Sequence, residues 1–184
     1  MNPMTPTNSG TPDLRFPIGR YAPPAEITDK QVEAWIDEIA ALPADLRATV
    51  APLTDEQLDT PYRPDGWTVR QVVHHLFDSH ANSYVRFKWT LTEDRPAIKA
   101  YDEKAWAELP DARGPVGPSL DALEALHARW EDLLRQMSWP QFQLEFVHPD
   151  AGAIPLARNV GLYAWHGRHH LAHIERLIER EAWM

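Results

Sequence analysis

Apolar residues recur every three or four positions in four stretches of the chain, the spacing that is typical of the buried face of an amphipathic helix. Thr54 and Thr68 are each followed three residues later by glutamine, the capping-box pattern that starts a helix, and Ser119 is placed to cap a later one. Pro43 either kinks the first helix or opens its second half, because proline has no N–H to donate. We therefore expect four long helices, over residues 28–50, 68–93, 119–139 and 156–181.

The segments between these helices are rich in proline and glycine. Residues 94–118 are interpreted as a long crossover loop, and residues 142–155 as a turn or a small hairpin. Residues 1–13 are expected to be a disordered tail, and residues 14–27 an extended arm that lies over the domain. The predicted fold class is all-α, an antiparallel four-helix bundle with long crossover loops and an extended N-terminal arm, in a single domain over residues 14–184.

Composition narrows the class of protein. The formal net charge of −9 gives no basic footprint for phosphate backbones, so we expect no nucleic-acid partner. The absence of cysteine excludes disulfides, thiolate metal ligands and a cysteine nucleophile, and it favours a reducing compartment. Because neither a signal peptide nor an apolar run of membrane-spanning length is found, the prediction is a cytoplasmic protein with no membrane partner.

Histidines are concentrated on the second and fourth predicted helices, which carry seven of the nine in the chain. His166 and His170 are four residues apart, so they lie on one helix face and can direct their rings to a common point. A third histidine from another helix would complete a metal site. On the second helix His80 lies nearest the middle of the apolar stripe, His75 lies at its edge and His74 lies farther round. Periodicity alone therefore leaves the third ligand open.

Three protein ligands with one open position are typical of catalytic zinc, whereas a structural zinc normally has four protein ligands. Imidazole suits both zinc and nickel, and we expect one divalent ion of either metal per chain. A fourth ligand, for which His80 and Asp78 are candidates, would instead favour a metal-containing sensor or binding protein without catalytic activity. His173 shares the stripe of the last helix but lies about 10 Å along it from His166, which is too far for a shared metal.

Several long segments have a distinctive sequence. They are LRFPIGRY in the arm, TDEQLDTPYRPDGWTVRQVVHHLFDSHANSYVRFKWTLTE at the second helix, YDEKAWAEL in the crossover and GLYAWHGRHHLAHIE in the last helix. These segments resemble the DinB/YfiT-like superfamily of metal-dependent bundle proteins, and within it the YfiT-type metal-dependent hydrolases. The resemblance implies a DinB-type four-helix bundle, a cytoplasmic homodimer and a small-molecule substrate.

The resemblance also implies a ligand set. In this family a Trp-Thr or Trp-Ser helix start leads to a His-Leu pair whose histidine binds the metal, and the last helix adds His-x-x-x-His. Here Trp67 and Thr68 lead to His75, which the resemblance makes the third ligand. The other two ligands that it implies are His166 and His170.

An open position on such a metal favours hydrolysis, since a bound water becomes acidic and a bound carbonyl is polarised. His-Glu-x-x-His proteases use the glutamate as general base, but here Gly167 follows His166, so no residue is assigned to acid or base catalysis. The alternative reaction is thiol S-transfer, because relatives in the superfamily use low-molecular-weight thiols such as bacillithiol, which a metal deprotonates.

Two further features are candidates for binding a substrate. Arg168 could hold a carboxylate of a substrate or cofactor, although a helix arginine is more commonly just solvated. The crossover around Tyr101, Asp102 and Trp106 is the best candidate for a lid, and ordinary packing is the alternative.

Overall fold

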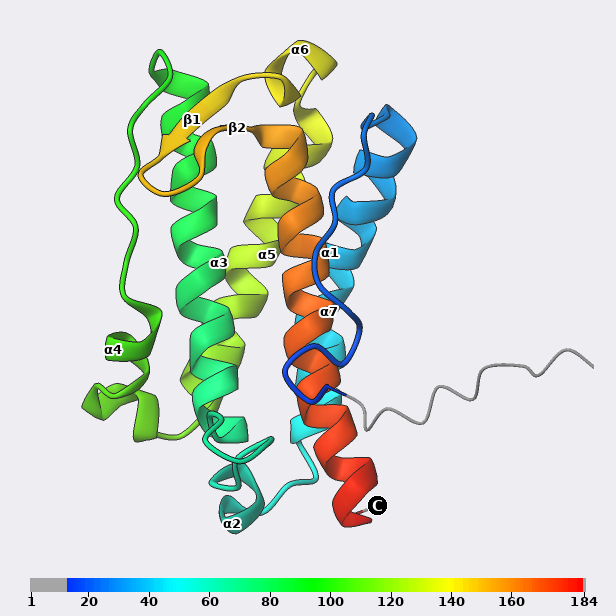
Figure 1. Ribbon diagram of the computed structural model, residues 1–184, viewed down its shortest axis with the longest axis vertical. Helices are drawn as coiled ribbons and strands as arrows, with labels where there is room; N and C mark the ends of the chain where they lie inside the picture. Colours follow the sequence, from blue (N-terminus) through cyan, green and yellow to red (C-terminus); the bar gives the residue numbers. More distant parts are fainter. Residues whose placement is uncertain (1–12, 184) are drawn as a thin grey trace, which may run out of the picture.

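Four long helices form the body of the computed structural model, which describes residues 13–183 (Figure 1). They are α1 (Asp29–Val50), α3 (Val69–Thr92), α5 (Gly117–Gln136) and α7 (Leu156–Glu181). Both α1 and α3 pack against α5 and α7, so α1 and α3 occupy opposite corners of the bundle. The all-α four-helix bundle is confirmed. The tail predicted over residues 1–13 lies outside the described residues, apart from Asp13.

The crossover sets the direction of the third long helix. In Figure 1, α1 and α7 run towards the lower end of the bundle, whereas α3 and α5 both run towards the upper end. The chain returns between α3 and α5 through α4 (Glu103–Ala107) and the short 3₁₀ helix η1 (Pro110–Arg113). We predicted only a loop here. The Asp102 carboxylate starts α4 by accepting the N–H groups of Lys104 and Ala105, at 3.1 and 3.0 Å.

The other two connections between long helices also contain short elements. Two helices of one turn each, α2 (Asp55–Leu58) and α6 (Trp139–Phe142), precede α3 and the hairpin, respectively. The predicted hairpin consists of β1 (Glu145–His148) and β2 (Gly152–Pro155), which pair antiparallel. Both predicted capping boxes, at the starts of α2 and α3, are present.

The start of α5 differs from the prediction. The helix begins at Gly117 and has Pro118 in its first turn, where the missing proline N–H costs nothing. Ser119 therefore lies inside the helix and does not cap it. Its hydroxyl lies 2.8 Å from Nδ1 of His74 and contacts α3 instead.

Pro43 lies inside α1, which continues through it to Val50. Because proline has no N–H, the carbonyl of Ile39, four residues earlier, lacks its usual partner within the helix. Ile39 is buried, so this carbonyl needs a donor from another element.

The N-terminal arm follows α7 over much of its length, as Figure 1 shows. The Tyr21 hydroxyl donates to the carbonyl of Arg158 at 3.2 Å. Near the other end of the arm, the Phe16 ring lies 5.9 Å from that of His169. The predicted arm over the domain is confirmed, and it covers α7, which carries four of the nine histidines.

The buried apolar side chains form two clusters, one towards each end of the bundle. The upper cluster includes Ile36, Ile39, Phe87, Trp130, Val160 and Tyr163. The lower cluster includes Leu42, Leu46, Val73, Leu76, Leu123 and Leu177. Between the two clusters, α3, α5 and α7 contribute histidines, and α1 contributes the Ile39 carbonyl, which contacts the histidine of α5. In the described part of the chain, none of the helices is both long and apolar enough to cross a membrane.

The lower cluster should carry much of the stability. Leu46 is fully buried, so Leu46→Ala is expected to lower the free energy of unfolding by about 2–5 kcal/mol, from lost burial and the cavity that remains. Urea denaturation measures the change. The control is Leu144→Ala, at a side chain that is 42% exposed, with an expected change below about 0.5 kcal/mol. Equal effects of the two substitutions would contradict the assigned core.

Candidate metal centre

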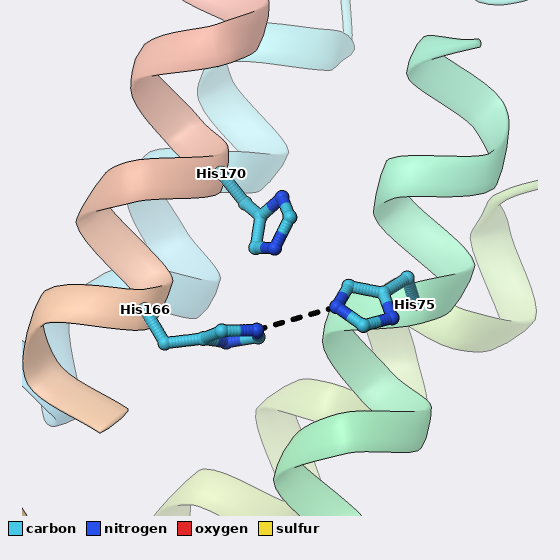
Figure 2. A group of neighbouring side chains, drawn as sticks. All are labelled: His75, His166 and His170. Atoms are coloured by element: carbon cyan, nitrogen blue, oxygen red, sulfur yellow. Dashed lines mark hydrogen bonds between the residues drawn. The ribbon is translucent and has the colours of Figure 1, made fainter. Parts of the chain in front are cut away.

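Three histidines from two helices meet between the apolar clusters. His75 comes from α3, and His166 and His170 come from successive turns of α7. Figure 2 shows the three rings directed towards one another across the gap between these helices. One nitrogen from each ring lies within 4.8 Å of the others, and together they form a group that could hold a metal ion.

The spacing of the ring nitrogens matches that of a metal site. The Nε2 atoms of His75 and His166 are 3.2 Å apart. Two nitrogens of a tetrahedral zinc ion, each about 2.05 Å from the metal, are separated by roughly 3.3 Å. The donor set and its spacing therefore fit a divalent metal ion.

Local structure explains why the rings converge. His166 and His170 are one turn apart on α7, and their ring centroids are 4.5 Å apart. The Trp67 indole, just before α3, lies 4.6 Å from the ring of His75 and 6.3 Å from that of His170, roughly parallel to the latter. The tryptophan restricts both rings to orientations that face the site.

Burial keeps these imidazoles neutral. It lowers the pKa of His75 to about 4, and it lowers the pKa of His166 and His170 well below the ordinary value, with the neighbouring histidines adding to the effect. A neutral imidazole has a free lone pair on one nitrogen. The rings are therefore available to a metal at neutral pH without first losing a proton.

A cavity of about 740 Å³ gives access to all three rings. Its walls include Trp67, Arg15 and Phe16 from the arm, and Glu103 and Lys104 from α4. The arm and the crossover therefore border the site from two sides.

The proposed lid residues have different positions. Tyr101 lines a smaller cavity of about 400 Å³, which also reaches His166. Its ring packs 4.6 Å from that of Trp106, while Asp102 caps α4. The segment therefore lies beside the site. Its residues Glu103 and Lys104 line the cavity of about 740 Å³.

The two candidates for a fourth ligand are not in the metal group. Within residues 13–183, the group around His75 contains no other histidine or carboxylate. His80 contacts His166 from the far side, through Nδ1 of the latter. The pKa of Asp78 is raised to about 6 by burial and by Asp111, but its carboxylate does not join the group. One side of the cluster thus remains open to the cavity.

The other histidines of α3 and α7 have structural contacts. His74 lies 2.8 Å from the Ser119 hydroxyl and 3.1 Å from the carbonyl of Gly114. His173 donates from Nε2 to the carbonyl of Arg15 at 3.3 Å, and so holds the arm. His169 stacks on Trp165, at 4.5 Å between ring centroids.

Two residues beside His166 face away from the site. Arg168 pairs with Glu38 of α1 at 3.1 Å, so the prediction that it holds a substrate carboxylate is not supported. A Cβ on Gly167 would lie 2.5 Å from Cδ2 of Leu42. A side chain at position 167 would therefore require the buried Leu42 side chain to move, which disfavours the glutamate of His-Glu-x-x-His proteases here.

Sequence reasoning did not single out His127. It lies on α5 and is buried, and its Nε2 is 2.9 Å from Nδ1 of His80. A lone histidine on an apolar helix gives little signal by itself. The proline at position 43 was the available clue, because it frees the carbonyl that His127 contacts.

The fold and the site together define a four-helix bundle with an open three-histidine cluster. The family model of the DinB superfamily matches residues 38–174, and the chain belongs to this superfamily. The resemblance seen in the sequence is confirmed.

Individual relatives agree with this assignment. A protein from Bacillus cereus (strain AH820), provisionally named a metal-dependent hydrolase, is 53% identical over 171 residues, which cover 93% of this chain and 99% of the relative. A relative with the same provisional description from Oceanobacillus iheyensis is 52% identical over 169 residues, 92% of this chain and 98% of the relative. The solved structure of YfiT from Bacillus subtilis, described as a probable metal-dependent hydrolase with an unusual four-helix bundle topology, is 51% identical. It matches with a TM-score of 0.91 over 94% of this chain and 99% of that chain.

The buried neutral histidines should make the stability of the metal-free protein depend on pH. His75 and His127 have a pKa of about 4 when folded and 6.5 when unfolded. The unfolded chain therefore binds more protons below about pH 6.5, and the free energy of unfolding should fall between pH 6.5 and 4. The expected slope is up to about 1.4 kcal/mol per pH unit for each such histidine.

Urea denaturation of the metal-free protein at several pH values between about 7.5 and 4.5 measures this slope. His127→Gln removes one of the titrating groups and should make the slope shallower. A free energy of unfolding that does not change with pH would show that these rings are not held neutral by the fold.

Proposed function

We propose that the chain is a hydrolase of a small-molecule substrate that holds one divalent ion, zinc or nickel, through His75, His166 and His170. The supporting observation is a cluster of three neutral imidazoles at the base of an open cavity, with no fourth protein ligand in the group among residues 13–183. Structural zinc normally has four protein ligands, so the open side favours catalysis over a purely structural metal. The provisional names of the relatives point to the same class of reaction.

The residues of the chain have distinct roles in this proposal. A divalent ion held by the three histidines would supply Lewis acidity and lower the pKa of a water molecule in the open position. Trp67 orients the rings of His75 and His170 and excludes water from one side of them. The cavity of about 740 Å³ is within the range of roughly 300–1,000 Å³ that accommodates small molecules.

Thiol S-transfer is the alternative reaction at the same centre. The chain contains no cysteine, so a thiol such as bacillithiol would have to enter the cavity as a second ligand. A cytoplasmic homodimer, which the family resemblance implies, likewise stays a prediction.

Metal content tests the ligand set. We expect about one zinc or nickel ion per chain in the purified protein by elemental analysis. His166→Ala should lose the metal, because two imidazoles remain for a site that needs three. His74→Ala removes a buried histidine of the same helix as His75 and should retain the metal. Full metal content in His166→Ala would reject the assignment.

The reaction class is tested by a substrate panel. The metal-loaded protein should hydrolyse at least one of a series of esters and amides without added thiol, and His170→Ala should lower that rate by about 100-fold or more, because the metal supplies several kcal/mol of stabilisation. Parallel assays with bacillithiol and an electrophilic acceptor test the alternative. Turnover that strictly requires the thiol would reject hydrolysis as the primary activity.

A further inference from the structure

Three histidines and one carbonyl form a continuous line of hydrogen bonds that leads into the site. Nδ1 of His127 lies 2.6 Å from the carbonyl oxygen of Ile39, and its Nε2 lies 2.9 Å from Nδ1 of His80. Nε2 of His80 lies 3.2 Å from Nδ1 of His166. We call His127, His80 and His166 the histidine relay. The first two are 1% and 0% exposed, so bulk water does not compete for their nitrogens.

The carbonyl fixes the direction of the first hydrogen bond. A carbonyl oxygen only accepts, so Nδ1 of His127 carries the proton and donates it. The Ile39 carbonyl is free for this bond because Pro43 supplies no N–H to it. Within the described bundle, His127 thus takes the place of the missing helix hydrogen bond.

Neutrality then fixes the remaining directions. His127 and His80 are buried, and within the described residues their ring nitrogens contact other imidazoles and a carbonyl but no carboxylate, so each ring is neutral and has one donor and one acceptor. Nε2 of His127 is therefore an acceptor, and Nδ1 of His80 donates to it. Nε2 of His80 is in turn an acceptor, and Nδ1 of His166 donates to it.

The last step concerns the nitrogen that faces the site. With its proton on Nδ1, neutral His166 has its lone pair on Nε2, the atom that lies 3.2 Å from Nε2 of His75. We infer that Pro43, His127 and His80 are positioning residues that fix the tautomer of His166, so that Nε2 is always the atom offered to a metal. This inference rests on the proposed metal site and extends it to two helices, α1 and α5, that contribute no ligand.

A hydrogen bond to the second ring nitrogen of a metal-binding histidine generally raises metal affinity. The other ring nitrogen of a metal-binding histidine almost always has a hydrogen-bond partner, and loss of that partner costs about 10- to 100-fold in metal affinity. In most sites the partner is a carboxylate, a backbone carbonyl or water. Here a neutral histidine is the partner, and the carbonyl lies two rings farther away.

Nuclear magnetic resonance of the metal-free protein tests the inference directly. In the full-length chain labelled with ¹⁵N-histidine, the shifts of the ring nitrogens distinguish protonated from unprotonated atoms, and single substitutions assign them. We expect the proton on Nδ1 in all three rings of the relay at neutral pH. A proton on Nε2 of His127 or of His166 would overturn the inference, even if the protein binds metal as proposed.

Metal affinity of matched variants gives the second test. His80→Phe keeps a ring but removes the acceptor for His166, and it should weaken zinc binding by about 10- to 100-fold in competition with a chromophoric chelator. His80→Gln has an oxygen that can accept from the same Nδ1, so it should recover most of the affinity. His74→Phe is the control, because His74 is buried on the same helix but bonds to Ser119 and Gly114.

The outcomes separate the two proposals. Absence of zinc binding in the unsubstituted protein would overturn the proposed function. Normal zinc binding that His80→Phe leaves unchanged would overturn only the relay. If His80→Phe does not fold, Pro43→Ala replaces it, because the introduced alanine would supply an N–H to the Ile39 carbonyl and compete with His127. The relay then predicts a detectable Nε2-protonated population of His127 in the ¹⁵N spectrum, and an unchanged spectrum would contradict it.

Discussion

Buried imidazole nitrogens need partners, and the middle of this bundle holds several of them in one layer. Apolar clusters lie on both sides of the layer, so water cannot solvate most of these rings and burial keeps them neutral. Each neutral ring has one nitrogen that donates and one that accepts. Hydrogen bonding satisfies this requirement on the α5 side, at His80 and His127. On the other side three ring nitrogens face a cavity, and the buried Nδ1 of His170 has no partner among the described residues. The need of buried imidazole nitrogens for partners therefore accounts for the hydrogen-bonded histidines in the core and for the three histidines that could hold a metal.

The four long helices could be predicted because each buries a long apolar stripe at helical spacing. The capping boxes at Thr54 and Thr68 located the starts of two helices, because a capping box is a pattern of four consecutive residues that the sequence shows directly. The short helices of the crossover were missed because five residues or fewer carry no periodicity. Ser119 was misread as a cap because its hydroxyl has a tertiary partner, His74, which the local sequence cannot reveal.

The site could be predicted in part. His166 and His170 followed from their spacing alone, whereas the choice of His75 needed the family resemblance because the helical wheel placed His80 nearer the core. The structure explains that ambiguity, since His80 is indeed the more buried residue and serves the relay, while His75 lies at the edge that meets the cavity. His127 could not be found from its own helix, because its role depends on a carbonyl that a proline frees on another helix.

The central claim is that His75, His166 and His170 together bind one metal, each through one ring nitrogen, and leave a position open. Anomalous diffraction from crystals of the zinc-loaded protein, measured at the zinc absorption edge, tests it most directly. The account predicts one strong peak at about 2.0–2.1 Å from one nitrogen of each of the three rings, Nε2 in the case of His166, with a non-protein ligand completing the coordination. A peak elsewhere, or a fourth protein ligand on the same ion, would contradict it.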